Sequence, residues 1–361
     1  MPVEINGLLH HNLSSETQPI PSSHYDVEAI RHLARLHDEG GYDRVLIANA
    51  AVMPDNISVA GHVGAVTERL GVMLAHRPGF IAPTMAARML ATLDHLMGGR
   101  LAVHIITGAS DIEMQADGDY LSKEERYARS AEYIDILRAI WSSDTPVDHE
   151  GEYFRFRGGF AEIKPVQKSG VPVYFGGMSP AALKVAARSA DTFATLSDTV
   201  AGMKQLVETV QPAAAALGRA PNFLMSIRIV LGDSEADAWR RADILRGQIA
   251  AAMPNLESNK LAAAAASGFQ RTAELAERGD RLEKCFWNGI NQLRGGQSNS
   301  GTLVGDADQI VDALMDYYDV GVNAFILRGF DPVDDTVRIG REILPALRKR
   351  VAERDAEREV A

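Results

Sequence analysis

The stretch LAVHIITG, residues 101–108, decides the fold prediction. It is an apolar run of strand length, and segments with helical periodicity lie on both sides of it, at 82–96 and 123–141. Pro83 stands near the start of the first of these helices, and Gly98 and Gly99 follow its end, where such residues are usually found. A strand enclosed by helices in this way is typical of a parallel α/β sheet.

The same alternation continues along the chain. Further strands are expected at 5–9, 44–47, 72–75, 172–177, 192–196, 223–231 and 324–329. With 101–108 they make about eight strand–helix units, the number found in a (β/α)8 TIM barrel. We therefore predict an α/β fold in one domain over 1–361, with a doubly wound open sheet as the alternative.

Two segments interrupt this alternation. Residues 148–158 alternate around a Glu-Gly turn, which predicts an inserted hairpin. Residues 246–306 precede the last strand–helix unit and include an Ala-rich stretch and the polar, Gly-rich stretch 294–306. An insertion between a late strand and its helix lies at the catalytic mouth of a barrel, so we expect a mobile lid there. An excursion that packs against a second subunit is the alternative.

The composition argues against several classes of protein. Lys and Arg total 37 and Asp and Glu 48, so the net charge of −11 disfavours a nucleic-acid partner. The single cysteine, Cys285, excludes an intrachain disulfide and a cysteine-based zinc site, and no other metal ligands are seen to converge. No apolar run approaches about 20 residues, and no secretory signal is visible. We expect a cytoplasmic enzyme with no metal, membrane or nucleic acid.

A phosphate site is a candidate at 172–183, although no G-x-G-x-x-G follows a strand and no Walker-type loop, G-x-S-x-G or H-E-x-x-H is present. The strand ends in two glycines, and Ser179 then precedes a helix that begins with proline. The glycines allow close backbone approach, and the helix start offers free N–H groups beside the serine hydroxyl. An ordinary serine N-cap is the alternative.

Histidines are the candidates for acid–base work. His10, His11, His76 and His104 stand near the carboxyl ends of expected strands. Adjacent residues on a strand face opposite sides, so we expect one of His10 and His11 to enter the barrel mouth and the other to pack outward. For most histidines of the chain, a structural role is the alternative.

Several of these segments together resemble a known family. They are LDHLMGGRLAVHIITGAS (93–110), DGDYLSKEERYARSAEYIDILRAIW (117–141), the run at 76–96, YFGGMS (174–179), RGGQSNSGTLVGD (294–306) and RIGREILPAL (338–347). In this order they resemble the bacterial luciferase-like flavin monooxygenases, and within that family the alkanesulfonate monooxygenase branch.

The resemblance implies a (β/α)8 barrel that uses O2 and reduced FMN, supplied by a separate NAD(P)H-dependent flavin reductase. For the sulfonates of that branch, cleavage of the carbon–sulfur bond gives sulfite and an aldehyde. It also implies a homo-oligomer, a dimer or tetramer. By position, it implies flavin contacts at Thr107 and Tyr127, a phosphate loop at Gly177, Met178 and Ser179, and a lid arginine at Arg294.

The expected substrate pocket departs from that branch. An arginine and a histidine two apart on the seventh strand are replaced by Ser226 and Arg228, and a tyrosine after the last strand is replaced by Phe330. Arg228 and Arg328 are candidates for gripping an anionic substrate. With the phenol absent, His10, His11 or His104 would supply any acid–base step. Met53, Leu196 and Pro332 replace a cysteine, a tryptophan and a histidine of the pattern.

The leading hypothesis is a monooxygenase that uses reduced FMN and acts on a small, anionic organosulfur compound, with alkanesulfonate desulfonation as the favoured reaction. Two alternatives stay open. The first is a deazaflavin-dependent oxidoreductase on the same barrel. The second is a flavin-binding relative without turnover, which the substitutions at Met53, Leu196 and Phe330 suggest.

Overall fold

A closed barrel of parallel strands forms the centre of the molecule in the computed structural model, which describes residues 3–108, 110–256, 267–295 and 301–360. Around the barrel the strands are β1 (Glu4–Leu9), β2 (Arg44–Ile47), β3 (Gly71–His76), β4 (Leu101–Ile105), β7 (Val173–Gly176), β8 (Thr192–Leu196), β9 (Asn222–Leu231) and β13 (Ala324–Arg328). All pairs are parallel, and the β8–β9 and β9–β13 pairs close the ring. The barrel prediction is confirmed, and the open-sheet alternative is wrong.

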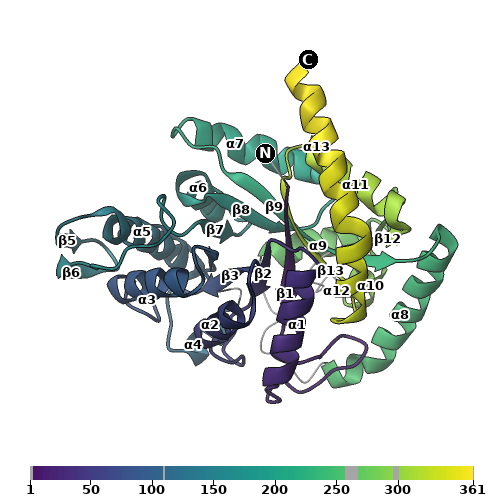
Figure 1. Cartoon of the computed structure of the whole chain (residues 1–361), viewed down its shortest axis with the longest axis horizontal. Helices are drawn as coiled ribbons and strands as arrows, with labels where there is room; N and C mark the ends of the chain where they lie inside the picture. The colour runs from purple at the N-terminus through teal and green to yellow at the C-terminus, as the bar shows by residue number, and fades with distance from the viewer. Residues whose placement is uncertain (1–2, 109, 257–266, 296–300, 361) are drawn as a thin grey trace.

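Helices surround the barrel and bury the outward faces of its strands (Figure 1). They are α1 (Val27–Glu39), α2 (Asn56–Val66), α3 (Pro83–Leu96), α4 (Asp111–Ala116), α5 (Lys123–Ser142), α6 (Pro180–Ser189), α7 (Val200–Ala215), α11 (Ala307–Asp319), α12 (Asp334–Arg338), the π-helical turn η2 (Ile339–Ile343) and α13 (Leu344–Val360). Helix starts follow local chemistry, because the side chains of Asp26, Ser122 and Ser179 each cap a helix N-terminus. No helix in the described ranges is long and apolar enough to cross a bilayer.

Alternation along the strands places a small apolar layer inside the barrel. That layer consists of Met73, Ala102, Tyr174, Ala194, Leu224, Ala324 and Ile326. Two residues further along, the same side of the strands carries His104, Gly176, Leu196, Ser226 and Arg328. The packed layer is therefore the floor, and polar side chains begin above it at the carboxyl ends.

Both predicted insertions are present. Strands β5 (Val147–Glu150) and β6 (Arg155–Gly159) form the expected antiparallel hairpin. The longer insertion contains α8 (Glu235–Leu256), α9 (Ser267–Glu277), β10 (Arg281–Glu283), β11 (Phe286–Trp287), α10 (Gly289–Leu293) and β12 (Thr302–Gly305).

Strand β12 was not expected within 294–306. It is fully buried and runs parallel to the outer half of β9, with Thr302 beside Arg228 and Gly305 beside Leu231. This segment belongs to the sheet, and the lid prediction concerns the rest of the insertion. Residues 257–266 and 296–300 lie outside the described residues, so lid motion stays a prediction.

Candidate functional site

A cavity of about 470 Å³ opens at the carboxyl ends of the barrel strands, directly above the apolar floor. Most of its wall is apolar and comes from the barrel strands and the loops after them: Leu8, Leu46, Ala48, Met53, Ile106, Met178, Ala194, Leu196, Leu224 and Ile326. Its polar side chains come from several elements, among them His104 on β4, Arg328 on β13 and Tyr127 on α5. An apolar chamber with sparse polar groups at this end of a barrel is the usual form of a ligand site.

One wall contains the residues expected to hold a flavin. Thr107, Tyr127, Gly177 and Met178 all line the cavity. Gly177 has φ of +139°, and an added Cβ would lie 2.7 Å from the Tyr127 hydroxyl oxygen. The glycine therefore brings the backbone against the tyrosine where no other residue fits.

Ser179 stands just behind this wall as the N-cap of α6. Its Oγ accepts a hydrogen bond from the Ala182 amide at 3.2 Å. Ser179 is therefore an N-cap, as the alternative interpretation expected, and this bond uses one lone pair of its hydroxyl oxygen. The hydroxyl proton is still available to donate. Ser179 thus caps the helix and can also serve an anion at the helix start.

Arg126 is a positioning residue that sequence reasoning missed. It is buried, and its Nε donates to the Thr107 carbonyl at 2.9 Å. Its other nitrogens donate to the Leu121 carbonyl at 2.6 Å and the Asp111 carboxylate at 2.8 Å. Arg126 fixes the loop after β4 on α5, where it also precedes Tyr127 in the chain. In the sequence Arg126 stands within a segment of helical periodicity, and that local pattern does not indicate a contact with the loop after β4.

His104 lies at the floor of the cavity, on β4. Neither of its ring nitrogens has a hydrogen-bond partner, although both are buried. Burial lowers the pKa of His104 to about 4, so the ring is neutral at pH 7. Space above it depends on Gly176, whose added Cβ would lie 3.1 Å from the His104 Nε2. A neutral imidazole with both nitrogens free can donate and accept toward a bound molecule.

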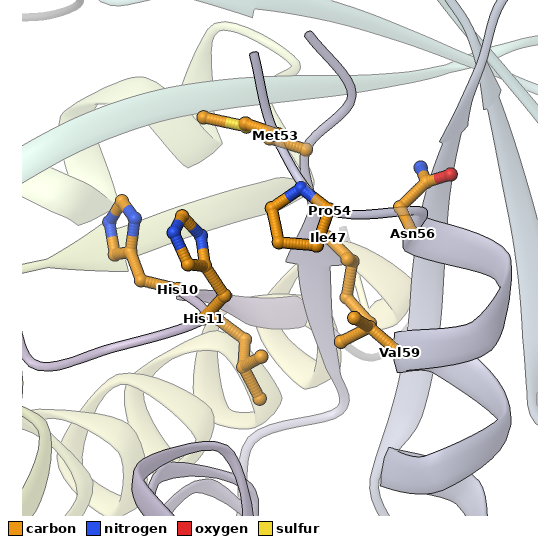
Figure 2. A pocket seen from close by; sticks show the side chains of 9 residues that line it. His10, His11, Ile47, Met53, Pro54, Asn56 and Val59 are labelled. Atoms are coloured by element: carbon orange, nitrogen blue, oxygen red, sulfur yellow. The ribbon is translucent and has the colours of Figure 1, made fainter. Parts of the chain in front are cut away.

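His10 and His11 follow the end of β1 at Leu9, so the strand rule that separates neighbours does not apply to them. Both line a hollow of about 20 Å³, and Figure 2 shows their rings beneath Met53 and beside Pro54. His10 also lines the main cavity. Burial, assisted by Arg328, lowers its pKa to about 4.

His11 is held differently from its neighbour. Its Nε2 donates to the Ser22 carbonyl at 2.9 Å, and its ring stacks on Tyr25 at 6.4 Å between centroids. The main cavity wall does not include it. Of the two adjacent histidines, the structure therefore brings His10 to the candidate site and uses His11 to hold the loop after β1.

Arginines gather at one end of the cavity. Arg228 and Arg328 are register partners on β9 and β13, which places like charges side by side. Arg328 lines the cavity, whereas Arg228 is buried behind it, with its guanidinium 4.6 Å from the Phe330 ring centroid. Phe330 is itself buried and forms the backing of Arg228 rather than a cavity wall.

Glu16 is the acidic partner of this cluster and was not expected from the sequence. Its carboxylate forms an ion pair with Arg228 Nη2. Burial alone would raise the Glu16 pKa, but Arg228 and Arg328 lower it to about 2. Nothing in the residues after the first strand points to β9, because the two partners are 212 residues apart in the chain.

The remaining cations are poorly compensated. Burial and the neighbouring Arg228 lower the pKa of Arg328 to about 9, and burial lowers the pKa of Arg294. Within the described ranges the side chains of Arg328 and Arg294 form no hydrogen bond or ion pair. The Nε and Nη1 atoms of Arg228 are buried without partners. No group of three potential metal ligands occurs among the same residues.

Comparisons with known proteins agree with this geometry. The family model described as luciferase-like monooxygenase matches residues 8–324. This match confirms both the resemblance and the expected enzyme class.

Solved structures share the fold at low identity. DmoA from Hyphomicrobium sulfonivorans is 21% identical, with a TM-score of 0.78 over 97% of this chain and 89% of that one. A long-chain alkane monooxygenase, LadA, is 18% identical, with a TM-score of 0.77 over 97% and 92%. A coenzyme F420-dependent secondary alcohol dehydrogenase is 20% identical, with a TM-score of 0.68 over 96% and 99%.

Proposed function

Since the chain belongs to the luciferase-like monooxygenase family, we propose that it oxidises a small, anionic organosulfur compound with O2 and reduced FMN. The favoured reaction is desulfonation of an alkanesulfonate to an aldehyde and sulfite. One observation carries the proposal: the wall of an apolar cavity at the barrel mouth contains Arg328, whose side chain has no partner within the described ranges, and also Gly177 and Tyr127.

One wall of the cavity fits a flavin. Thr107, Tyr127 and Gly177 line the same cavity, and the backbone at Gly177 lies so close to Tyr127 that an added Cβ would strike the tyrosine hydroxyl. We assign Thr107 and Tyr127 to the ring system, and Gly177, Met178 and Ser179 to the phosphate. The start of α6 would attract that phosphate through its free N–H groups and dipole.

Bound reduced FMN would supply the electrons that activate O2, with one oxygen atom entering the aldehyde and the other leaving as water. The protein's own groups would bind, orient and exclude water. The apolar walls would keep water from the reacting atoms, and Arg328, with Arg228 buried behind it, would hold the anionic end of the substrate. His104 and His10, both neutral at pH 7, would accept or return a proton at a ring nitrogen.

Reduced FMN must come from outside, so we include an NAD(P)H-dependent flavin reductase as the partner. We also propose a homo-oligomer, a dimer or tetramer, and a cytoplasmic location. We propose Arg294, which follows α10 in the inserted segment, as the lid arginine.

The test is turnover with a reductase present. The protein is incubated with NADH, FMN, a flavin reductase and a panel of sulfonates, sulfones and thioethers, and sulfite and aldehyde are measured. Sulfite release that needs O2, reductase and this protein supports the proposal. Failure on the whole panel would contradict it and favour a flavin-binding relative without turnover.

The similarity to the coenzyme F420-dependent dehydrogenase favours a second candidate, a deazaflavin-dependent oxidoreductase on this barrel. Anaerobic titration separates the two: the protein is titrated with reduced FMN and, in parallel, with the reduced deazaflavin. Tight binding of FMN alone supports the first function, and tight binding of the deazaflavin alone supports the second.

A further inference from the structure

A lysine lines the main cavity on the side that we assign to the flavin. Lys123 is the first residue of α5, and Tyr127 stands four residues further along the same helix. Both side chains line the cavity, together with Thr107 and Gly177. Residues four apart on a helix are neighbours on one face, so Lys123 lies beside Tyr127 on the face of α5 that borders the cavity.

Hydrogen bonds fix the start of α5 in place. Ser122 caps the helix and forms a capping box with Glu125. Arg126 joins the same turn to the loop after β4, because its Nε donates to the Thr107 carbonyl at 2.9 Å. The Lys123 backbone is therefore held at the edge of the cavity.

The start of α5 lies next to the start of α6. The two helices come after the neighbouring strands β4 and β7 in the chain, and they pack against each other (Figure 1). Tyr127 connects them, because its ring lies 6.2 Å from that of Phe175 on β7 and an added Cβ at Gly177 would lie 2.7 Å from its hydroxyl oxygen. Lys123 and the segment 177–179, which we assign to the phosphate, therefore border the same corner of the cavity.

Local forces disfavour a cation at this position. A helix N-terminus is the positive end of the helix dipole and favours acidic side chains in its first turn. Lys123 occupies that turn, and burial and the neighbouring Arg126 lower its pKa. The phosphate donors assigned so far, the Ser179 hydroxyl and the N–H groups of α6, are neutral. A phosphate in this corner would stabilise the lysine, and the lysine would add a charged donor to the neutral ones.

The other cation of the cavity wall lies across the barrel. Among the described residues that line the cavity, the lysine is Lys123 and the arginine is Arg328. Arg328 is on β13, which is four strands from β4 in either direction around the ring, through β1, β2 and β3 or through β9, β8 and β7. The two cations therefore stand on opposite sides and can serve two different anions.

We propose that Lys123 binds the phosphate of FMN, so that the site distinguishes FMN from riboflavin, while Arg328 stays available for the anion of the substrate. The inference rests on the proposed function, because it concerns the cofactor of the same site. It adds a charged residue to a phosphate site that otherwise consists of a helix start and a serine.

The test measures the binding of two flavins that differ by the phosphate. Reduced FMN and reduced riboflavin are titrated by calorimetry without O2 into the wild type and into Lys123→Gln. Lys123 is partly exposed, so the loss of its charged hydrogen bond should weaken FMN binding by roughly tenfold, at the lower end of the usual range. Riboflavin binding should not change, which also shows that the variant is folded. An equal loss for both flavins, or no loss for FMN, would overturn the inference.

Two further variants separate the charge of Lys123 from its packing. Lys123→Arg keeps the charge and should retain most of the preference for FMN. Lys168→Gln removes the same charge from an exposed position in the loop that leads into β7, at the amino end of the barrel, and should bind both flavins like the wild type. If Lys123→Arg loses the preference as fully as Lys123→Gln, the charge does not recognise the phosphate and the inference is wrong.

The same measurements distinguish a failure of this inference from a failure of the proposed function. If Lys123→Gln and the wild type bind reduced FMN equally well, the cofactor stands and the role of Lys123 is wrong. If the wild type binds neither flavin, the cofactor of the proposed function is contradicted and the inference fails with it. If Lys123→Gln weakens the binding of propane-1-sulfonate instead of FMN, Lys123 serves the substrate and the inference is wrong.

Discussion

Both ends of the barrel carry arginines that are paired with carboxylates, but one arginine at the carboxyl end, Arg328, is different. At the amino end, Arg44 donates to Glu4 at 2.7 Å and Arg348 to Asp43 at 2.9 Å, and Tyr174 also donates to Glu4 at 2.7 Å. At the carboxyl end, Arg328 has no such partner within the described ranges. Arg44 and Arg348 therefore each have a carboxylate partner that holds them in the fold, whereas the Arg328 side chain faces the cavity without one.

The largest expected effect comes from breaking the ion pair between Arg228 and Glu16 at the carboxyl end. Arg228→Met leaves Glu16 charged without its partner, which should cost about 3–5 kcal/mol of unfolding free energy. The double variant Arg228→Met/Glu16→Gln should recover most of that loss, because it removes the orphaned charge. Urea denaturation measures both. A small loss in the single variant, or no recovery in the double, would show that the pair is not buried in the way described.

The histidines of the carboxyl end predict a dependence of stability on pH. Burial lowers the pKa of His104 to about 4, so between about pH 6.5 and 4 the unfolded chain binds a proton that the folded chain does not. Stability should therefore fall by about 3 kcal/mol for this group as the pH drops through that window, and change no further below it.

The variant His104→Gln should reduce the slope of unfolding free energy against pH, by an amount that corresponds to the uptake of up to one proton on unfolding. Denaturation at several pH values between 4 and 7 gives both slopes. Identical slopes for wild type and His104→Gln would contradict a buried, neutral ring.

Two glycines extend the comparison between the ends. An added Cβ at Gly177 would lie 2.7 Å from the Tyr127 hydroxyl oxygen, and one at Gly71, beside Arg44, would lie 2.7 Å from the Arg100 carbonyl oxygen. Both alanine variants should lose about 1–3 kcal/mol of stability from forced contacts or strain. Only Gly177→Ala should also weaken FMN binding, as a fluorescence titration would measure. Equal loss of FMN affinity in both variants would refute the flavin wall.

Much of this architecture can be predicted from the sequence, because strand and helix periodicity is local. The run at 101–108 and its flanking helices indicate the barrel, and the hairpin at 148–158 is visible from its alternation. Strand β12 escapes prediction because Thr302–Gly305 is short and follows a polar, Gly-rich segment. Its burial depends on pairing with the outer half of β9, which no local pattern reveals.

The candidate site could be predicted in part, for a related reason. Gly177 indicates a close backbone approach and Ser179 indicates a helix start, so the placement of both follows from local sequence rules. The adjacency of Arg228 and Arg328 depends on β9 and β13 being neighbours, which follows only from barrel closure. The Glu16 contact is between a loop and a distant strand, and composition says nothing about it.

The smallest expected effect decides whether the contrast between the ends is real. Arg328 is the register partner of Arg228 on the neighbouring strand, and its side chain has no partner of its own within the described ranges. Because Arg328→Met removes this cation, the free energy of unfolding should rise by about 1 kcal/mol. Arg44→Met breaks a pair whose two side chains are 20% and 25% exposed, so stability should fall. If the urea midpoint rises in Arg328→Met and falls in Arg44→Met, the unpaired arginine at the carboxyl end lowers stability and is retained for binding. If both variants lose stability, Arg328 is held by the protein and the site is not kept open for an anion.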